Sequence, residues 1–292
     1  MSTDFPVLTK TFHTSVYRSI DPKNLSVAGK TILITGGGRG IGKAIATAFA
    51  VAGARAIIIL GRTASVLENA VKEISGAAKT AGHESIIRHF AADITDAEAI
   101  SHVFKTIRDE FGNVDVVVNN AGGLHLGTIE DSDSSAYVKS FETNVKGTLH
   151  VMQSFLCFGL NRNAPGPATF INLSTVGIAM PTMPTWSAYV ASKLAAFTMT
   201  AFLGAEVGDA LRVFSIHPGR IATDMSSKAG IPTFDDVGTY FGNEFVLSNR
   251  TDADDVQDSP VRFACGSLLS QRQTFCRRGW WRVIGMLMSF WG

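Results

Sequence analysis

The segment WSAYVASKLA, residues 186–195, carries a tyrosine and a lysine four positions apart among small and apolar residues. Side chains at this spacing lie on one face of an α-helix, so Tyr189 and Lys193 can point into the same space. A free phenol has a pKa of about 10, which is too high for proton transfer at neutral pH. A neighbouring ammonium group stabilises the phenolate and would lower that pKa, which would make Tyr189 a general acid or base. Such a pair also occurs in ordinary packing, so its surroundings decide its meaning.

A glycine-rich turn, TGGGRGIG at residues 35–42, follows an apolar segment and opens a helical pattern. Glycines allow a tight turn and let the backbone approach a pyrophosphate, whose negative charge is favoured at a helix N-terminus. The spacing is GxxxGxG rather than GxGxxG, but the strand-to-helix setting predicts a dinucleotide site. Its candidate residues are Gly36, Gly38, Arg39, Gly40, Ile41 and Gly42.

The end of the second apolar segment, IIILGRTAS, bears on which dinucleotide is bound. An acidic residue there would bond the ribose 2′-hydroxyl of NAD, and this chain has none. Arg62 follows the segment instead, and Arg39 lies inside the glycine turn. Two guanidinium groups suit a 2′-phosphate, so the sequence favours NADP over NAD. The alternative is that both arginines are solvated surface residues.

Apolar segments alternate with helical patterns along the chain. The expected strands are short apolar runs within residues 31–37, 56–60, 85–93, 114–122, 168–175 and 211–219. The expected helices occupy 42–54, 64–82, 96–112, about 134–160, and 188–208, with Asp96 as an N-cap. Most strands are apolar on both faces, which predicts an α/β fold: a single doubly wound, Rossmann-like parallel sheet with helices on both faces.

The chain has 292 residues and 46% apolar content, enough for one sizeable core. We expect an N-terminal arm over residues 1–29, a Rossmann-like domain over 30–264 and an atypical tail over 265–292. A substrate lid is expected within the domain at about 226–250. The tail is basic and rich in tryptophan, and it is interpreted either as native or as the product of a frameshift.

Composition excludes several classes of function. A net charge of +1 gives no indication of a basic surface for nucleic acid or an anionic membrane. The three cysteines form no CxxC pair, which argues against a metal site and for a reducing compartment. The first residues lack the apolar core of a signal peptide, and no run approaches the roughly 20 apolar residues of a membrane span. We therefore expect a cytoplasmic protein whose partner is a small molecule.

These motifs together resemble the short-chain dehydrogenase/reductase family. The resemblance covers about residues 28–226 and is carried, in family order, by TGGGRGIG, ADIT, NNAG, ETNVKG, INLST, YVASK and HPGRIATDM. The N-terminal TFHTSVYRSIDP and the segment LRVFSIHPGRIATDM also resemble fungal members of secondary metabolism.

The resemblance implies roles for several residues toward a nicotinamide cofactor. Asp93 would meet the adenine amino group. The floor beneath the adenosine ribose would be formed by Asn119, Ala121 and Gly122. The segment after the sixth strand would cover the nicotinamide, with Pro218, Gly219, Ile221 and Thr223 near its carboxamide.

The resemblance also implies a catalytic set. Tyr189 would donate or accept the proton, Lys193 would bond the nicotinamide ribose and lower the pKa of the phenol, and Asn144 would hold a water of the proton relay. Asn144 could instead be a helix-kink or capping residue. A serine usually orients the substrate: Thr175 fits that position by motif alignment and Ser174 by residue type, and we lean to Ser174.

The leading interpretation is an NADP(H)-dependent oxidoreductase that moves a hydride between nicotinamide and a carbonyl or secondary alcohol. Its substrate would be a small, partly apolar secondary metabolite. The family resemblance favours a homodimer or homotetramer. Two alternatives remain: a dinucleotide-binding protein with weak or no activity, such as a sensor or degraded copy, and a nicotinamide-assisted isomerase.

Overall fold

The computed structural model describes residues 21–219 and 221–230 together with the backbone of two strands, 244–248 and 273–276. The strands are β1 (Thr31–Thr35), β2 (Ala56–Gly61), β3 (Ile86–Ala91), β4 (Val116–Asn119), β5 (Ala168–Leu173), β6 (Leu211–Ile216), β7 (Glu244–Ser248) and β8 (Gln273–Cys276). The helices are α1 (Gly40–Val51), α2 (Ala64–Thr80), α3 (Ala97–Phe111), α4 (Ser134–Phe141), α5 (Thr148–Ser154), α6 (Ser187–Val207) and α7 (Asp224–Lys228). Two π-helical turns, Glu142–Gly147 and Phe155–Gly159, follow α4 and α5, and three short 3₁₀ turns span Pro22–Asn24, Val176–Ala179 and Gly208–Ala210.

The strands form one sheet in the order β3-β2-β1-β4-β5-β6-β7-β8. Strands β1 to β6 pair in parallel, which confirms the six strands and the doubly wound α/β fold expected from the apolar runs. The order reverses between β1 and β4, and a ligand crevice lies at such a switch point in this class of fold. Strand β7 pairs antiparallel with β6, and β8 pairs antiparallel with β7; neither strand is predicted from the sequence.

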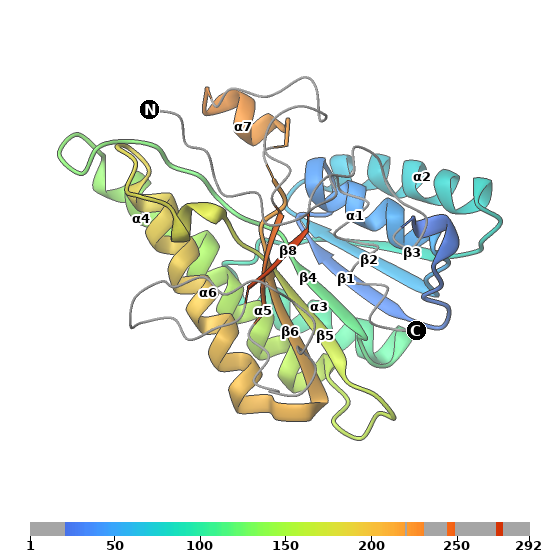
Figure 1. Cartoon of the computed structure of the whole chain (residues 1–292). Coiled ribbons are helices and arrows are strands. Elements are labelled where there is room, and N and C mark those ends of the chain that lie inside the picture. The colour runs from blue at the N-terminus through green and yellow to red at the C-terminus, as the bar shows by residue number, and fades with distance from the viewer. Residues whose placement is uncertain (1–20, 220, 231–243, 249–272, 277–292) are drawn as a thin grey trace.

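Helices cover both faces of the sheet, with α1 and α2 on one side and α3 to α6 on the other (Figure 1). One apolar cluster joins α1 and α2 to alternate residues of the strands, and a second joins the other alternate residues to α3, α5 and α6. This alternation explains why the central strands are apolar on both faces. The N-cap expected at Asp96 is confirmed, because its carboxylate accepts the Ala99 N–H at 3.0 Å.

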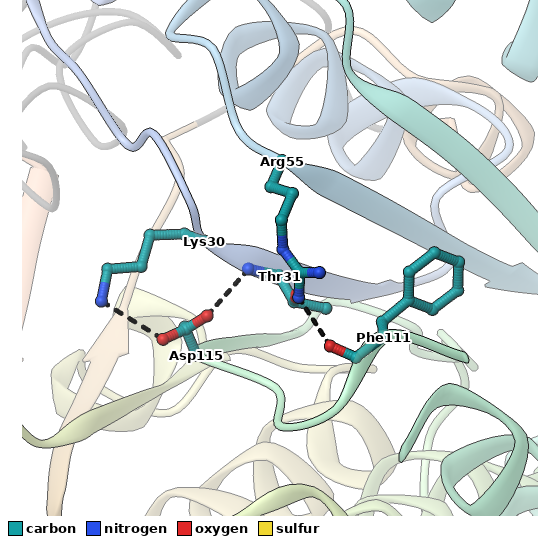
Figure 2. A network of polar contacts seen from close by, with 5 residues as sticks. All are labelled: Lys30, Thr31, Arg55, Phe111 and Asp115. Atoms are coloured by element: carbon teal, nitrogen blue, oxygen red, sulfur yellow. Dashed lines mark hydrogen bonds and ion pairs between the residues drawn. The ribbon is translucent and has the colours of Figure 1, made fainter. Parts of the chain in front are cut away.

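The amino-terminal edge of the sheet carries a network of polar side chains (Figure 2). The Asp115 carboxylate, just before β4, accepts the Thr31 N–H at 2.8 Å and the Lys30 ammonium at 3.2 Å. Arg55, just before β2, donates to the Thr31 hydroxyl and to the Phe111 carbonyl at the end of α3, both at 2.6 Å. Three strand starts and one helix end are therefore tied together at the edge opposite the glycine turn.

Helix α6 is long and apolar enough, by length and composition, to cross a membrane. Core helices of soluble proteins pass the same test, so this is weak evidence of a span. Seven residues of α6 are buried within the fold: Ala188, Ser192, Lys193, Ala196, Phe197, Thr200 and Leu203.

Candidate active site

The glycine turn joins the end of β1 to the start of α1. Gly36 and Gly40 adopt positive φ angles of 67° and 51°, which non-glycine residues rarely take. Arg39 is the N-cap of α1, and its side chain makes no capping hydrogen bond. The N–H groups of the first helical turn therefore lack a side-chain cap and point toward the crevice end of the sheet. This arrangement fits a pyrophosphate, because backbone N–H groups and the helix dipole both favour an anion there.

The turn packs tightly against the end of β4. A Cβ added at Gly42 would overlap the Gly36 carbonyl and lie 2.7 Å from Asn120 Nδ2. The Asn120 side chain donates to the carbonyls of Thr35 and Gly36 at 2.9 and 3.3 Å, and the Thr35 hydroxyl accepts the N–H groups of Asn120 and Ala121. Asn120 thus holds the glycine turn in place. No role is predicted for Asn120 from the motif NNAG, although a polar pair directly after an apolar strand is a usable signal.

The neighbouring Asn119 faces the opposite way from the crevice. It is 2% exposed, and its amide donates to the Thr148 hydroxyl at 2.9 Å and to Asn172 Oδ1 at 3.0 Å. Its side chain therefore bridges β4 to α5 and β5 inside the fold. A contact between Asn119 and a cofactor ribose would have to come from its backbone.

Both arginines proposed for the 2′-phosphate lie next to carboxylates. Arg39 Nη1 is 3.4 Å from the Asp224 carboxylate at the start of α7, and Arg62 Nη1 is 3.9 Å from the Asp93 carboxylate after β3. Asp93 also accepts two hydrogen bonds from Thr95, each at 2.9 Å. Both arginine side chains are more than half exposed, so their pairs with carboxylates are weak and the guanidinium groups remain accessible to an anion.

The segment after β6 reaches over the glycine turn. A Cβ built at Gly40 would meet the Thr223 methyl at 3.4 Å, so Thr223 borders the turn across the crevice. Thr223 is also the N-cap of α7. Pro218, Gly219 and Ile221 lead from β6 toward this point, and Gly219 has a φ of 85°.

Tyr189 and Lys193 lie on one face of α6 beside the end of β5. The Tyr189 phenol is hydrogen-bonded to the Thr175 side chain. The Lys193 ammonium donates to the Leu173 carbonyl at 2.6 Å. Ser174 is placed differently: its hydroxyl is buried and has no hydrogen-bond partner among the residues that the structure describes. Of the two candidates for an orienting hydroxyl, Thr175 is therefore the one that meets Tyr189, and the preference for Ser174 finds no support in this geometry.

Burial controls the electrostatics of the pair. It raises the pKa of Tyr189 to about 12, which the hydrogen bond to Thr175 opposes in part, and it lowers the pKa of Lys193 to about 8. Burial is the largest influence on both pKa values, because desolvation disfavours the charged form of both groups. That Lys193 lowers the pKa of Tyr189 stays a prediction. At neutral pH the phenol therefore holds its proton, and a pKa this high makes it a weaker acid in the cofactor-free protein.

Asn144 lies within the π-helical turn Glu142–Gly147 and is 1% exposed. Its side chain accepts the Gly123 N–H and donates to the Gly123 carbonyl, both at 2.8 Å. A Cβ at Gly122 would lie 3.0 Å from Asn144 Oδ1 and 3.4 Å from Lys193 Nζ, so Gly122 leaves room for both side chains. The π-turn directs Asn144 to the strand end next to Lys193, and π-turns of this kind often mark functional sites.

A doubly wound sheet, an uncapped helix start behind a glycine turn and a Tyr–Lys pair at the same edge define a dinucleotide-dependent oxidoreductase site. Residues 30–231 match the family model described as short chain dehydrogenase. The chain therefore belongs to the short-chain dehydrogenase family, whose members are oxidoreductases that bind a nicotinamide dinucleotide.

The curated relatives include fungal proteins. The short chain dehydrogenase tazN of Aspergillus terreus is 34% identical over 231 residues, which cover 78% of this chain and 49% of tazN. The chain thus spans about half the length of that relative. The short chain dehydrogenase pigC of Monascus ruber is 33% identical over 221 residues, covering 75% of this chain and 71% of pigC.

Solved structures agree with the fold. A short-chain type dehydrogenase/reductase from Mycobacterium ulcerans matches with a TM-score of 0.64 and 30% identity, over 71% of this chain and 74% of that chain. A xylitol dehydrogenase bound to NAD⁺ matches with a TM-score of 0.62 and 26% identity, over 70% of this chain and 75% of that chain.

Proposed function

We propose that this protein is an NADP(H)-dependent oxidoreductase that interconverts a carbonyl and a secondary alcohol. The observation that carries the proposal is the position of the Tyr189 phenol, which is hydrogen-bonded to Thr175 and lies one helical turn from Lys193. A bound nicotinamide supplies or accepts the hydride. Tyr189 holds the proton that reaches the carbonyl oxygen, and the Thr175 hydroxyl orients that oxygen. Lys193 places a positive charge next to the phenol as its proton leaves.

The assay for this function is oxidation of NADPH by a panel of ketones and aldehydes. Carbonyl-dependent oxidation supports the proposal. Tight NADPH binding without oxidation of any carbonyl would favour the rival function, a dinucleotide-binding protein that does not catalyse, and release of an isomerised substrate without net oxidation of NADPH would favour an isomerase.

A partly apolar substrate, of the size of a secondary metabolite, suits the surroundings of the phenol. The Trp186 ring lies 6.0 Å from the Tyr189 ring, edge to face. Aromatic groups near the reacting atoms favour a substrate with apolar surface.

The preference for NADP predicts a selective loss on removal of the two arginines. Arg39→Ala and Arg62→Ala are each expected to weaken NADPH binding about tenfold, because each removes a charge-assisted contact with the 2′-phosphate. Affinity for NADH, which lacks that phosphate, should change less than twofold. Fluorescence titration with both cofactors measures the ratio, and equal losses for NADPH and NADH would contradict the assignment.

The orienting hydroxyl is tested by a matched pair of substitutions. Thr175→Val removes the hydroxyl next to Tyr189 at nearly constant volume and is expected to lower kcat about 100-fold. Ser174→Ala removes a buried hydroxyl that bonds nothing in the structure, so its kcat should stay within about threefold of the parent. The kcat values of both variants test the assignment, and a larger loss of kcat in Ser174→Ala than in Thr175→Val would assign the orienting role to Ser174.

We also propose that the protein is a cytoplasmic homodimer or homotetramer without nucleic-acid or membrane partners. Exposed apolar residues on the outer helices support self-association: Val138, Leu149, Leu194 and Phe202 are between 41% and 61% exposed. Light scattering gives the molar mass in solution, and a monomeric mass would refute the assembly.

A further inference from the structure

A buried chain of hydrogen bonds connects the Asn144 turn to the helix that holds the reacting pair. Asn144 Nδ2 donates to the Ser192 hydroxyl at 2.9 Å, and that hydroxyl donates to the Tyr189 carbonyl at 2.8 Å. Ser192 has no exposed surface and Asn144 is 1% exposed. Water therefore cannot replace a partner that is lost, and each group of the chain depends on the next.

An extra hydrogen bond to the Tyr189 carbonyl affects the helical turn that carries Tyr189 and Lys193. In an α-helix the carbonyl of one residue accepts the N–H four residues later, so this carbonyl belongs to the turn that ends at Lys193. A serine hydroxyl that bonds the preceding turn bends a helix slightly. Ser192 therefore acts on the turn that sets the distance between the phenol and the ammonium.

We propose that Ser192 is a positioning residue that holds the Tyr189–Lys193 turn against Asn144. The hydroxyl receives the Asn144 amide on one side and fixes the Tyr189 carbonyl on the other, so that the two helical segments keep one relative placement. The inference rests on the proposed function, because it assigns Ser192 to the Tyr189–Lys193 chemistry. Ser192 itself needs no contact with substrate or cofactor.

Helix α6 offers a matched control for a purely structural role. Thr200, two turns further on, has no exposed surface, and its hydroxyl donates to the Ala196 carbonyl at 2.7 Å. It is thus a second buried hydroxyl bonded to the preceding turn of the same helix, but it lies away from Asn144. Thr200→Val and Ser192→Ala each remove one such hydroxyl.

Ser192→Ala is expected to lower kcat about tenfold with little change in the KM for the carbonyl substrate, because misplaced groups lose rate more than binding. Thr200→Val should keep the parent kcat. In the protein without cofactor, amide hydrogen exchange at Gly123 should accelerate in Ser192→Ala, since the Asn144 side chain that accepts this N–H loses its other anchor. Thr200→Val should leave Gly123 exchange unchanged.

Equal effects of Ser192→Ala and Thr200→Val on kcat and on Gly123 exchange would overturn the proposal. If Ser192→Ala does not fold, Ser192→Cys provides the second variant; its weaker hydrogen bonds should give a smaller loss of kcat and a smaller acceleration of exchange. A Ser192→Cys protein with parent values of both would also overturn it.

A double-mutant cycle tests whether Ser192 acts through Asn144. The double variant Asn144→Ala/Ser192→Ala should have a kcat less than about twofold below that of Asn144→Ala alone, because Asn144→Ala already removes the amide that bonds Ser192. A full tenfold further loss would show an independent role and refute the proposal. Tyr189→Phe, measured in the same assay, separates the role of Ser192 from the proposed function. A Tyr189→Phe enzyme with the parent rate refutes the proposed function. An inactive Tyr189→Phe enzyme together with an unaffected Ser192→Ala enzyme refutes only the role of Ser192.

Discussion

Tyr189→Phe is expected to lower kcat about 1,000-fold, because it removes the proton donor and leaves the ring in place. Burial raises the pKa of Tyr189 to about 12, so the parent phenol is protonated throughout the neutral range. Thr175 Oγ1 also accepts the backbone N–H of Gly177, a group that cannot supply a proton at neutral pH. Steady-state turnover of NADPH and a carbonyl substrate measures the loss.

Two observations accompany the Tyr189→Phe measurement. Tyr137→Phe removes a phenol hydroxyl on α4 and keeps the ring stacked on Phe141, so its kcat should match the parent. The dissociation constant for NADPH should be unchanged in both variants. A Tyr189→Phe enzyme with the parent rate would refute the proton-transfer role.

Gly42→Ala is expected to destabilise the folded protein by about 3 kcal/mol, the upper range for an overpacked site. The added methyl group would overlap the Gly36 carbonyl and crowd Asn120 Nδ2, and both neighbours are held by the hydrogen bonds at the ends of β1 and β4. Relief requires the glycine turn to move away from α1, which also removes the pyrophosphate site. Urea unfolding and NADPH titration measure the two losses.

Gly76→Ala is the matched control for this substitution. Gly76 lies within α2, and a Cβ there has no neighbour within 4 Å. Alanine should stabilise the helix by about 0.5–1 kcal/mol and leave NADPH binding unchanged. Parent-like stability and binding in Gly42→Ala would contradict the close packing described for the turn.

Much of the fold follows from local pattern. The runs TILIT and AIIIL are continuous apolar segments because helices cover both of their faces, and this made their assignment as buried parallel strands secure. The helical region expected at about 134–160 is continuous, but its division by two π-turns was not foreseeable, since no residue type marks an i to i+5 hydrogen bond. Strand β7 escaped notice because it pairs antiparallel to β6 only through long-range contacts within the expected lid region.

The kind of site was predicted from the sequence more successfully than the contacts of its individual side chains. Tyr189 and Lys193 lie at the end of β5, and Asn144 lies at the end of the neighbouring strand β4. The choice between Ser174 and Thr175 depends on the direction of each side chain after β5, which residue type alone does not give. The expected effect of Lys193 on the phenol leaves out burial, which a sequence does not reveal and which dominates both pKa values. The sequence predictions for the arm over residues 1–20 and for most of the tail over 265–292 lie outside the described residues.

The polar network of Lys30, Thr31, Arg55 and Asp115 has a consequence for variation of this scaffold. It fastens the starts of β1, β2 and β4 at the edge remote from the chemistry. Loops at the opposite edge, where the reaction takes place, can then change in length and composition to accept new substrates without destabilising the sheet. Engineering of substrate scope should therefore alter the loops after β4 and β5 and leave Lys30, Arg55 and Asp115 untouched.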